Sequence, residues 1–146
     1  MTVSSSDNYI DPAEVELEAD EFESEIEDKK QEITDLEDNL EAEDSIDEQV
    51  EIESQIAEAK DELAAIEVNA QDIIDLHQEC ENYARGSNLI SESIFAEYCE
   101  EFAYDTGDIS RDSSMTFYVD WDKYAEDMKM DYSTITFQGT DFYVQG

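Results

Sequence analysis

The chain of 146 residues contains 43 acidic and 7 basic residues, which gives a formal net charge of −36 at pH 7. A surface this anionic repels nucleic acid and anionic membranes, and it attracts basic proteins and free cations. Hydrophobic residues make up 40% of the chain and aromatic residues 10%. These fractions are too high for a wholly disordered acidic chain, so we expect part of it to fold.

The composition also indicates a cellular compartment. No apolar run approaches the ~20 residues that a membrane-spanning helix needs. The first residues form no basic or apolar signal region. Two cysteines, Cys80 and Cys99, are too few for a disulfide framework, and we expect reduced, partly buried thiols. These features predict a cytoplasmic protein that does not bind membranes.

A first long helix is predicted after a flexible tail of residues 1–10. Asp11 is a favourable N-cap, Pro12 suits the first helical position and Glu14 completes a capping box. Beyond them, apolar positions recur in steps of four and three, as in a coiled coil. This seam consists of Val15, Ala19, Phe22, Ile26, Lys29, Ile33, Leu36 and Leu40, with Lys29 as its one polar member.

A second seam with the same spacing predicts a second helix. Ser45 and Glu48 form another capping box between the two seams, which are out of register with each other. We therefore expect an antiparallel helical hairpin over residues 11–84, with a turn near residues 43–45. The second seam consists of Ile52, Ile56, Ala59, Leu63, Ile66, Ala70 and Ile73.

The alignment of the two seams supports the folded-back arrangement. Partner positions in an antiparallel hairpin have a constant sum, and the facing seam residues, from Leu36 with Ile52 to Val15 with Ile73, sum to 88 or 89. The alternative is one continuous helix that dimerises in parallel. The register break and the internal cap favour the hairpin.

The charge of the hairpin suggests what it could imitate. Residues 15–73 hold 24 acidic residues and three lysines, a net charge of −21. An arm of about 42 Å, at ~1.5 Å per residue, then carries one net negative charge every ~2 Å. Double-stranded DNA carries one per ~1.7 Å, and two packed helices are about as wide as a duplex. Adaptation to a high-salt cytoplasm and a generic acidic scaffold are the alternatives.

Residues 85–146 are predicted to form a small α+β unit, which makes the whole chain α+β. Gly86 breaks the chain and Ser91 caps a new helix that Gly107 ends. The stretch "MTFYVD" has the alternation of a strand, and its Asp120 caps a further helix. The apolar faces of the two helices are Phe95, Tyr98, Cys99, Phe102 and Ala103, and Trp121, Tyr124, Ala125 and Met128.

The chain is expected to close with two short antiparallel strands around a turn at Gln138–Asp141. Phe137 and Phe142 flank this turn and can pack on the helices. The apolar edge of the resulting sheet could pair two chains into a homodimer.

The region from "ENYARG" to the end of the chain resembles the C-terminal part of the ArdA-type antirestriction proteins. The resemblance implies a dimeric acidic protein from a phage or mobile element that imitates bent duplex DNA and inhibits type I restriction–modification enzymes. The family's N-terminal α+β domains are replaced here by the helical hairpin. The matching positions are Phe95-Ala96, Gly107, Tyr118 to Trp121, Tyr124 to Asp127, Asp131-Tyr132 and Phe142-Tyr143.

No set of residues predicts catalysis, a cofactor or a metal site. His77 is the single histidine and continues the second seam, so we interpret it as structural. Cys80 and Cys99 lack the CxxC spacing of zinc sites. The loop that contains Asp105, Asp108 and Asp112 lacks the spacing of a calcium-binding EF-hand. We therefore do not expect an enzyme.

These observations predict a DNA mimic that occupies the basic DNA-binding channel of a host defence enzyme, and does not itself bind nucleic acid. Type I restriction–modification enzymes are favoured by the resemblance, and an RNA-guided nuclease is an alternative target. The competing hypothesis is an acidic coiled-coil scaffold adapted to high salt. The carboxylates expected to stand in for phosphates are Glu23, Glu27, Asp38, Glu53, Asp61, Asp105, Asp108, Asp122, Glu126 and Asp127.

Overall fold

The computed structural model describes residues 2–84 and 86–145 and has the predicted α+β fold. Its contacts divide the chain into two compact units. We call Leu17–Ile74 the hairpin unit, and the described residues of Met1–Glu16 and Asp75–Gly146 the sheet unit. The division falls inside the two long helices rather than at residues 10 and 84. Among the described residues, no helix is long and apolar enough to cross a membrane.

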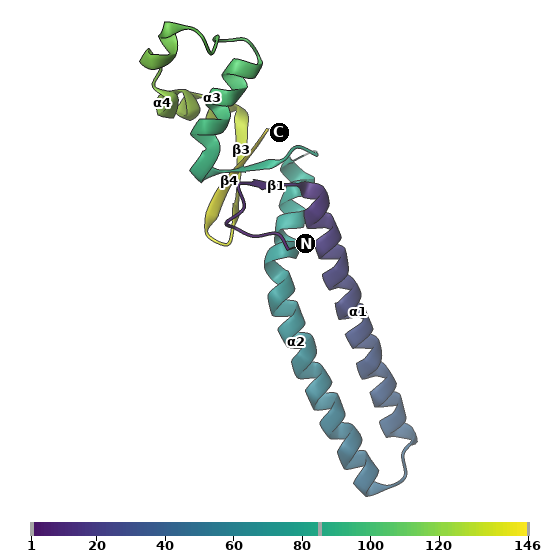
Figure 1. The fold of residues 1–146 in the computed structure, drawn as a ribbon. Helices are drawn as coiled ribbons and strands as arrows, with labels where there is room; N and C mark the ends of the chain where they lie inside the picture. Colours follow the sequence, from purple (N-terminus) through teal and green to yellow (C-terminus); the bar gives the residue numbers. More distant parts are fainter. Residues whose placement is uncertain (1, 85, 146) are drawn as a thin grey trace. The chain divides into compact units, whose positions relative to one another are not determined.

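Two long antiparallel helices form the hairpin unit (Figure 1). Helix α1 spans Pro12–Ala42 and helix α2 spans Ile46–Tyr83, so the chain turns at residues 43–45 as predicted. The alternative of one continuous helix is wrong. Every predicted seam residue is buried or partly buried in the structure. Six of them in this unit are buried: Ala19, Ile33, Ile56, Ala59, Ala70 and Ile73.

The helix starts are held by local hydrogen bonds. The Asp11 carboxylate accepts a hydrogen bond from the Ala13 N–H at 2.9 Å, as its predicted N-cap role requires. At the turn, Glu43 does what the sequence assigned to Ser45. Its Oε1 accepts from the N–H groups of Asp44 (3.1 Å) and Ser45 (3.0 Å), and its carbonyl accepts from the Gln49 side chain at 2.6 Å.

An antiparallel four-stranded sheet organises the sheet unit, in the order β1-β2-β4-β3. Strand β1 is Tyr9–Ile10, β2 is Leu89–Ser91, β3 is Tyr132–Phe137 and β4 is Thr140–Gln145. Cross-strand partners share a face of the sheet. The register therefore places six buried residues on one face: Ile10, Leu89, Ile135, Phe137, Phe142 and Val144.

Two helices provide the core on the other face of the sheet. Helix α3 spans Phe95–Asp105 and follows a short 3-10 helix, η1 (Glu92–Ile94); α4 spans Trp121–Met128. Phe95, Cys99 and Ala125 from this segment cluster with Ile90 and Tyr143 of the sheet. A 3-10 helix, η3 (Lys129–Asp131), links α4 to β3.

The cap residues predicted for these helices are confirmed. Ser91 caps the η1–α3 segment, and the Asp120 carboxylate accepts from the Lys123 N–H at 3.1 Å. Gly107 ends the α3 region with a φ of 81°, a left-handed conformation that favours glycine. Trp121 packs edge-on against Tyr104 and Tyr124.

The prediction of a flexible tail at residues 1–10 is wrong. Tyr9–Ile10 forms β1 at one edge of the sheet, and Val3 and Ile10 are 5% and 1% exposed. The Asn8 carbonyl accepts from the Ser91 N–H at 2.8 Å. The segment is ordered because it fills a core and pairs with β2, which lies some 80 residues away in the sequence.

The strand predicted in "MTFYVD" is also wrong. Residues Ser114–Tyr118 form a 3-10 helix, η2, and Val119 is extended without a strand partner. The Ser113 hydroxyl accepts from the Met115 N–H at 3.1 Å and its carbonyl accepts from the Thr116 N–H at 3.2 Å. This local capping competes with extension, and it leaves Phe117 89% exposed.

Candidate partner-binding surface

The five carboxylates predicted on the hairpin all face solvent. Glu23, Glu27 and Asp38 lie on α1, and Glu53 and Asp61 lie on α2. Among the described residues, no lysine, arginine or histidine lies within ion-pair distance of any of the five. Their oxygens are therefore available as acceptors for an external cationic group.

The hairpin unit keeps its negative charges close together. Its 23 acidic residues and three lysines give it a net charge of −20. Neighbours such as Glu23 and Glu27, four residues apart on α1, repel each other by a few tenths of a kcal/mol. The apolar seam offsets this cost by holding the two helices together.

Lys29 is the one cation inside the seam, and it links the two helices. Its Nζ lies 2.7 Å from a Glu32 oxygen on α1 and 2.6 Å from a Glu62 oxygen on α2. Hydrogen bonds to Glu32 and then Glu62 raise the pKa of Lys29 well above its usual range. This lysine is occupied by the protein's own carboxylates and adds no attraction for an anion.

The tip of the hairpin carries two interacting carboxyl groups. Hydrogen bonding from the Ser45 N–H lowers the pKa of Glu43, and a hydrogen bond with Glu48 lowers it further. The same bond with Glu43, together with charge repulsion, raises the pKa of Glu48. The tip therefore holds a fixed acceptor, Glu43, next to a carboxyl group that protonates more readily.

The five carboxylates predicted in the sheet unit are exposed as well, but two are paired. Asp105 lies 3.7 Å from an Arg111 nitrogen, and Glu126 lies 2.7 Å from the Lys129 ammonium. The three without an ion pair among the described residues are Asp108, Asp122 and Asp127. The sheet unit thus offers fewer unneutralised carboxylates than the hairpin unit.

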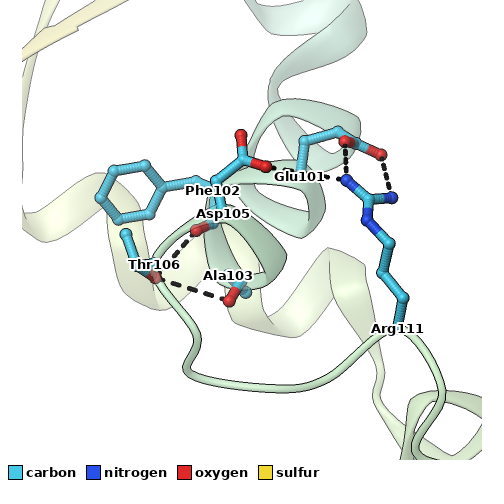
Figure 2. Close-up of polar contacts among 6 residues, drawn as sticks. All are labelled: Glu101, Phe102, Ala103, Asp105, Thr106 and Arg111. Carbon is cyan, nitrogen blue, oxygen red and sulfur yellow. Dashed lines mark hydrogen bonds and ion pairs between the residues drawn. The ribbon is translucent and has the colours of Figure 1, made fainter.

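Arg111 organises the loop between α3 and η2, a role that the sequence did not reveal. Figure 2 shows its guanidinium gripping Glu101 with two hydrogen bonds, of 2.7 Å and 3.3 Å. The guanidinium also lies 4.6 Å from the centre of the Tyr104 ring. Hydrogen bonding from Arg111 lowers the pKa of Glu101. The contact joins positions ten residues apart across a loop, so no helical spacing could have predicted it.

The same loop begins with a capped helix end. The Thr106 hydroxyl donates to the carbonyls of Phe102 (2.8 Å) and Ala103 (3.4 Å), as Figure 2 shows. These bonds satisfy carbonyls that the end of α3 leaves without helical partners. They fix the direction in which the acidic loop leaves the helix.

The residues considered for chemistry have structural surroundings. His77 lies 3.3 Å from a Glu81 oxygen, one turn further along α2. Cys80 and Cys99 are free and buried, and burial raises the pKa of each thiol to about 11. Within residues 2–84 and 86–145, no three histidine, cysteine or acidic side chains are grouped to hold a metal ion.

Comparison of the chain with protein-family models, curated proteins and solved structures found no match. The candidate surface therefore has to be interpreted from its own chemistry. It consists of exposed acceptors on an ordered pair of helices, and it suits a partner that presents many Lys and Arg donors.

Proposed function

We propose that the protein is a DNA mimic that occupies the DNA-binding channel of a host defence enzyme. A type I restriction–modification enzyme is the favoured target, because the C-terminal sequence resembles the ArdA-type antirestriction proteins. Carboxylates would take the place of phosphates and meet the Lys and Arg side chains that grip DNA.

The observation that carries this proposal is the charge spacing on an ordered rod. The helical segments of the hairpin unit, at ~1.5 Å per residue, are about 40 Å long. A net charge of −20 over that length is roughly one charge per 2 Å, against ~1.7 Å for duplex DNA. An acidic disordered tail could reach the same composition, but it would not hold its charges in fixed positions.

Binding of this kind should be distributed over many weak contacts. A single exposed ion pair contributes about 0.2–1 kcal/mol. Neutralising one carboxylate should therefore weaken inhibition only a few-fold, whereas neutralising five should weaken it by tens to about a hundredfold. Long-range attraction should also make association fast and sensitive to salt.

The test is inhibition of DNA cleavage by a purified type I restriction–modification enzyme, with an RNA-guided nuclease assayed in parallel. The five-site variant Glu23→Gln, Glu27→Gln, Asp38→Asn, Glu53→Gln and Asp61→Asn should lose inhibition. Its matched control exchanges Glu and Asp at the same five positions, which keeps the charge, and should inhibit like the natural chain.

Competition with DNA separates this proposal from the scaffold hypothesis. Unmodified duplex DNA added in excess should displace the protein from the enzyme, and raised salt should weaken the complex. Inhibition that one or two residues dominate, or that duplex DNA does not relieve, would contradict mimicry. A chain that inhibits neither enzyme and ignores DNA would support the scaffold hypothesis.

A further inference from the structure

Strand β3 forms an open edge of the sheet. Among the described residues it pairs with β4 alone, along all six of its positions from Tyr132 to Phe137. A strand at an edge leaves every second residue with its N–H and C=O directed away from the sheet.

The turn identifies which groups these are. Gln138 and Gly139 have φ values of 50° and 81°, as in a type I′ two-residue turn. The residues that flank such a turn, Phe137 and Thr140, exchange hydrogen bonds, and bonded positions then alternate along β3. The backbone groups of Thr134 and Thr136 consequently face outward.

Tyr132 has the same orientation, but its N–H already donates to the Lys129 carbonyl. Its carbonyl is left for an external donor. The open edge therefore offers the N–H groups of Thr134 and Thr136, and the carbonyls of Tyr132, Thr134 and Thr136.

This edge lacks the usual protection against strand pairing. Natural edge strands carry charged side chains, prolines or bulges that block a second strand. Residues 132–140, "YSTITFQGT", are instead the longest uncharged run in a chain of which 34% is charged. They contain no proline, and the register of β3 with β4 is continuous, so there is no bulge.

We propose that β3 pairs with β3 of a second copy of the chain, antiparallel and about a two-fold axis at Thr134. Thr134 would then face Thr134 of the partner subunit, and Thr136 would face Tyr132 of the partner subunit. The pairing forms about four new backbone hydrogen bonds, given that the Tyr132 N–H is engaged. It joins two four-stranded sheets into one of eight strands.

Charge argues for a second copy of this strand. Two chains of net charge −36 can approach closely only where neither presents a carboxylate, and β3 is such a place on both. The carboxylate next to it, Asp141, accepts a hydrogen bond from the Thr136 hydroxyl at 2.7 Å. Threonines opposite each other are a favourable cross-strand pair.

The dimer and the complex with a DNA-binding enzyme should respond to salt in opposite directions. Salt screens the repulsion between two anionic chains and so strengthens the dimer, whereas it weakens attachment to a basic channel. The dimer is thus independent of the proposed function, and either can fail alone.

Sedimentation equilibrium of the full chain tests the proposal. The average mass should rise from monomer to dimer with concentration over about 10–500 µM, and the midpoint should fall at least several-fold between 0.05 and 0.5 M NaCl. Thr134→Asp, which places two carboxylates face to face, and Thr134→Pro, which removes an outward N–H, should each leave a monomer. Thr134→Val keeps the backbone and adds no charge, and Asn88→Asp adds one charge outside β3; both should dimerise.

Hydrogen exchange provides a second measurement if a variant fails to fold. The Thr134 and Thr136 amides of the natural chain should exchange at least tenfold more slowly at dimer concentrations than at monomer concentrations. A chain that stays monomeric at 500 µM and 0.5 M NaCl would overturn the proposal. A dimer that survives both Thr134→Asp and Thr134→Pro, or that leaves the two amides unprotected, would also overturn it, because the interface would lie elsewhere.

Discussion

The sheet unit and the hairpin unit achieve order by different means. The eight largest fully buried side chains all belong to the sheet unit: Phe95, Phe142, Ile10, Leu89, Ile135, Val15, Val144 and Cys99. In the hairpin unit the only side chains exposed by 2% or less are the alanines Ala19 and Ala70, and its buried isoleucines are 4–8% exposed. The sheet unit has a packed core, whereas the hairpin unit has a thin seam between two charged surfaces. A protein that must display charge in fixed positions can afford only as much core as the display leaves room for.

Truncation of the sheet core should give the largest effect and would break the comparison if it did not. Phe142 is fully buried and cross-strand to Ile135, so Phe142→Ala should destabilise the sheet unit by about 3–5 kcal/mol. Ile33→Ala in the seam should fall towards the lower end of the usual 2–5 kcal/mol range. Denaturant unfolding followed by circular dichroism measures both. Phe117→Ala, at a site 89% exposed, is the control and should change stability by less than about 0.5 kcal/mol. Equal losses at Phe142 and Ile33 would contradict the contrast.

Salt should separate the two units by a smaller amount. Several like-charged pairs, each costing a few tenths of a kcal/mol, should make the hairpin unit about 1–2 kcal/mol more stable in 0.5 M salt than in low salt. Trp121, the single tryptophan, lies in the sheet unit, so its fluorescence reports that unit while helical circular dichroism is dominated by the hairpin. The helical signal should gain more thermal stability on adding salt than the tryptophan signal. Parallel shifts of the two signals would argue that charge repulsion is no greater in the hairpin.

The smallest effect is expected at the Arg111 contact. Since Arg111 lowers the pKa of Glu101, the stability from this pair is present above the ordinary glutamate pKa and is lost as pH falls through the lowered value. Arg111→Gln should raise the pKa of Glu101 back towards its ordinary range, as measured by NMR titration. Lys123→Gln, which removes an equal charge elsewhere in the unit, should leave that pKa nearly unchanged. If both variants shift it equally, the effect is the general field of the protein rather than the hydrogen bonds.

The sequence revealed the hairpin in detail because its signals are local. Seam spacing, the Asp11 cap and the break at residues 43–45 depend on neighbours within a few turns of helix. The β3–β4 hairpin was found for the same reason, since two residues join its strands. Pairing of Tyr9–Ile10 with Leu89–Ser91 was missed because its partners are far apart in the sequence.

The candidate surface was predictable only in part. Exposure of the ten carboxylates followed from their places outside the apolar faces. Which of them are neutralised depended on where cations come to lie in three dimensions, as with Arg111 beside Asp105. The strand predicted at Phe117 failed because alternation of side chains does not exclude a short 3-10 helix when a serine can cap it.

The turn at residues 43–45 has a consequence for how this molecule could change over time. Because α1 and α2 run antiparallel from it, removing or adding seven residues in each arm, next to the turn, preserves the seam and leaves the sheet unit's sequence untouched. Each such step alters the rod by about 10 Å, roughly the rise of three base pairs. The reach of the inhibitor would then be an adjustable length, set by paired insertions and deletions at one end of the hairpin.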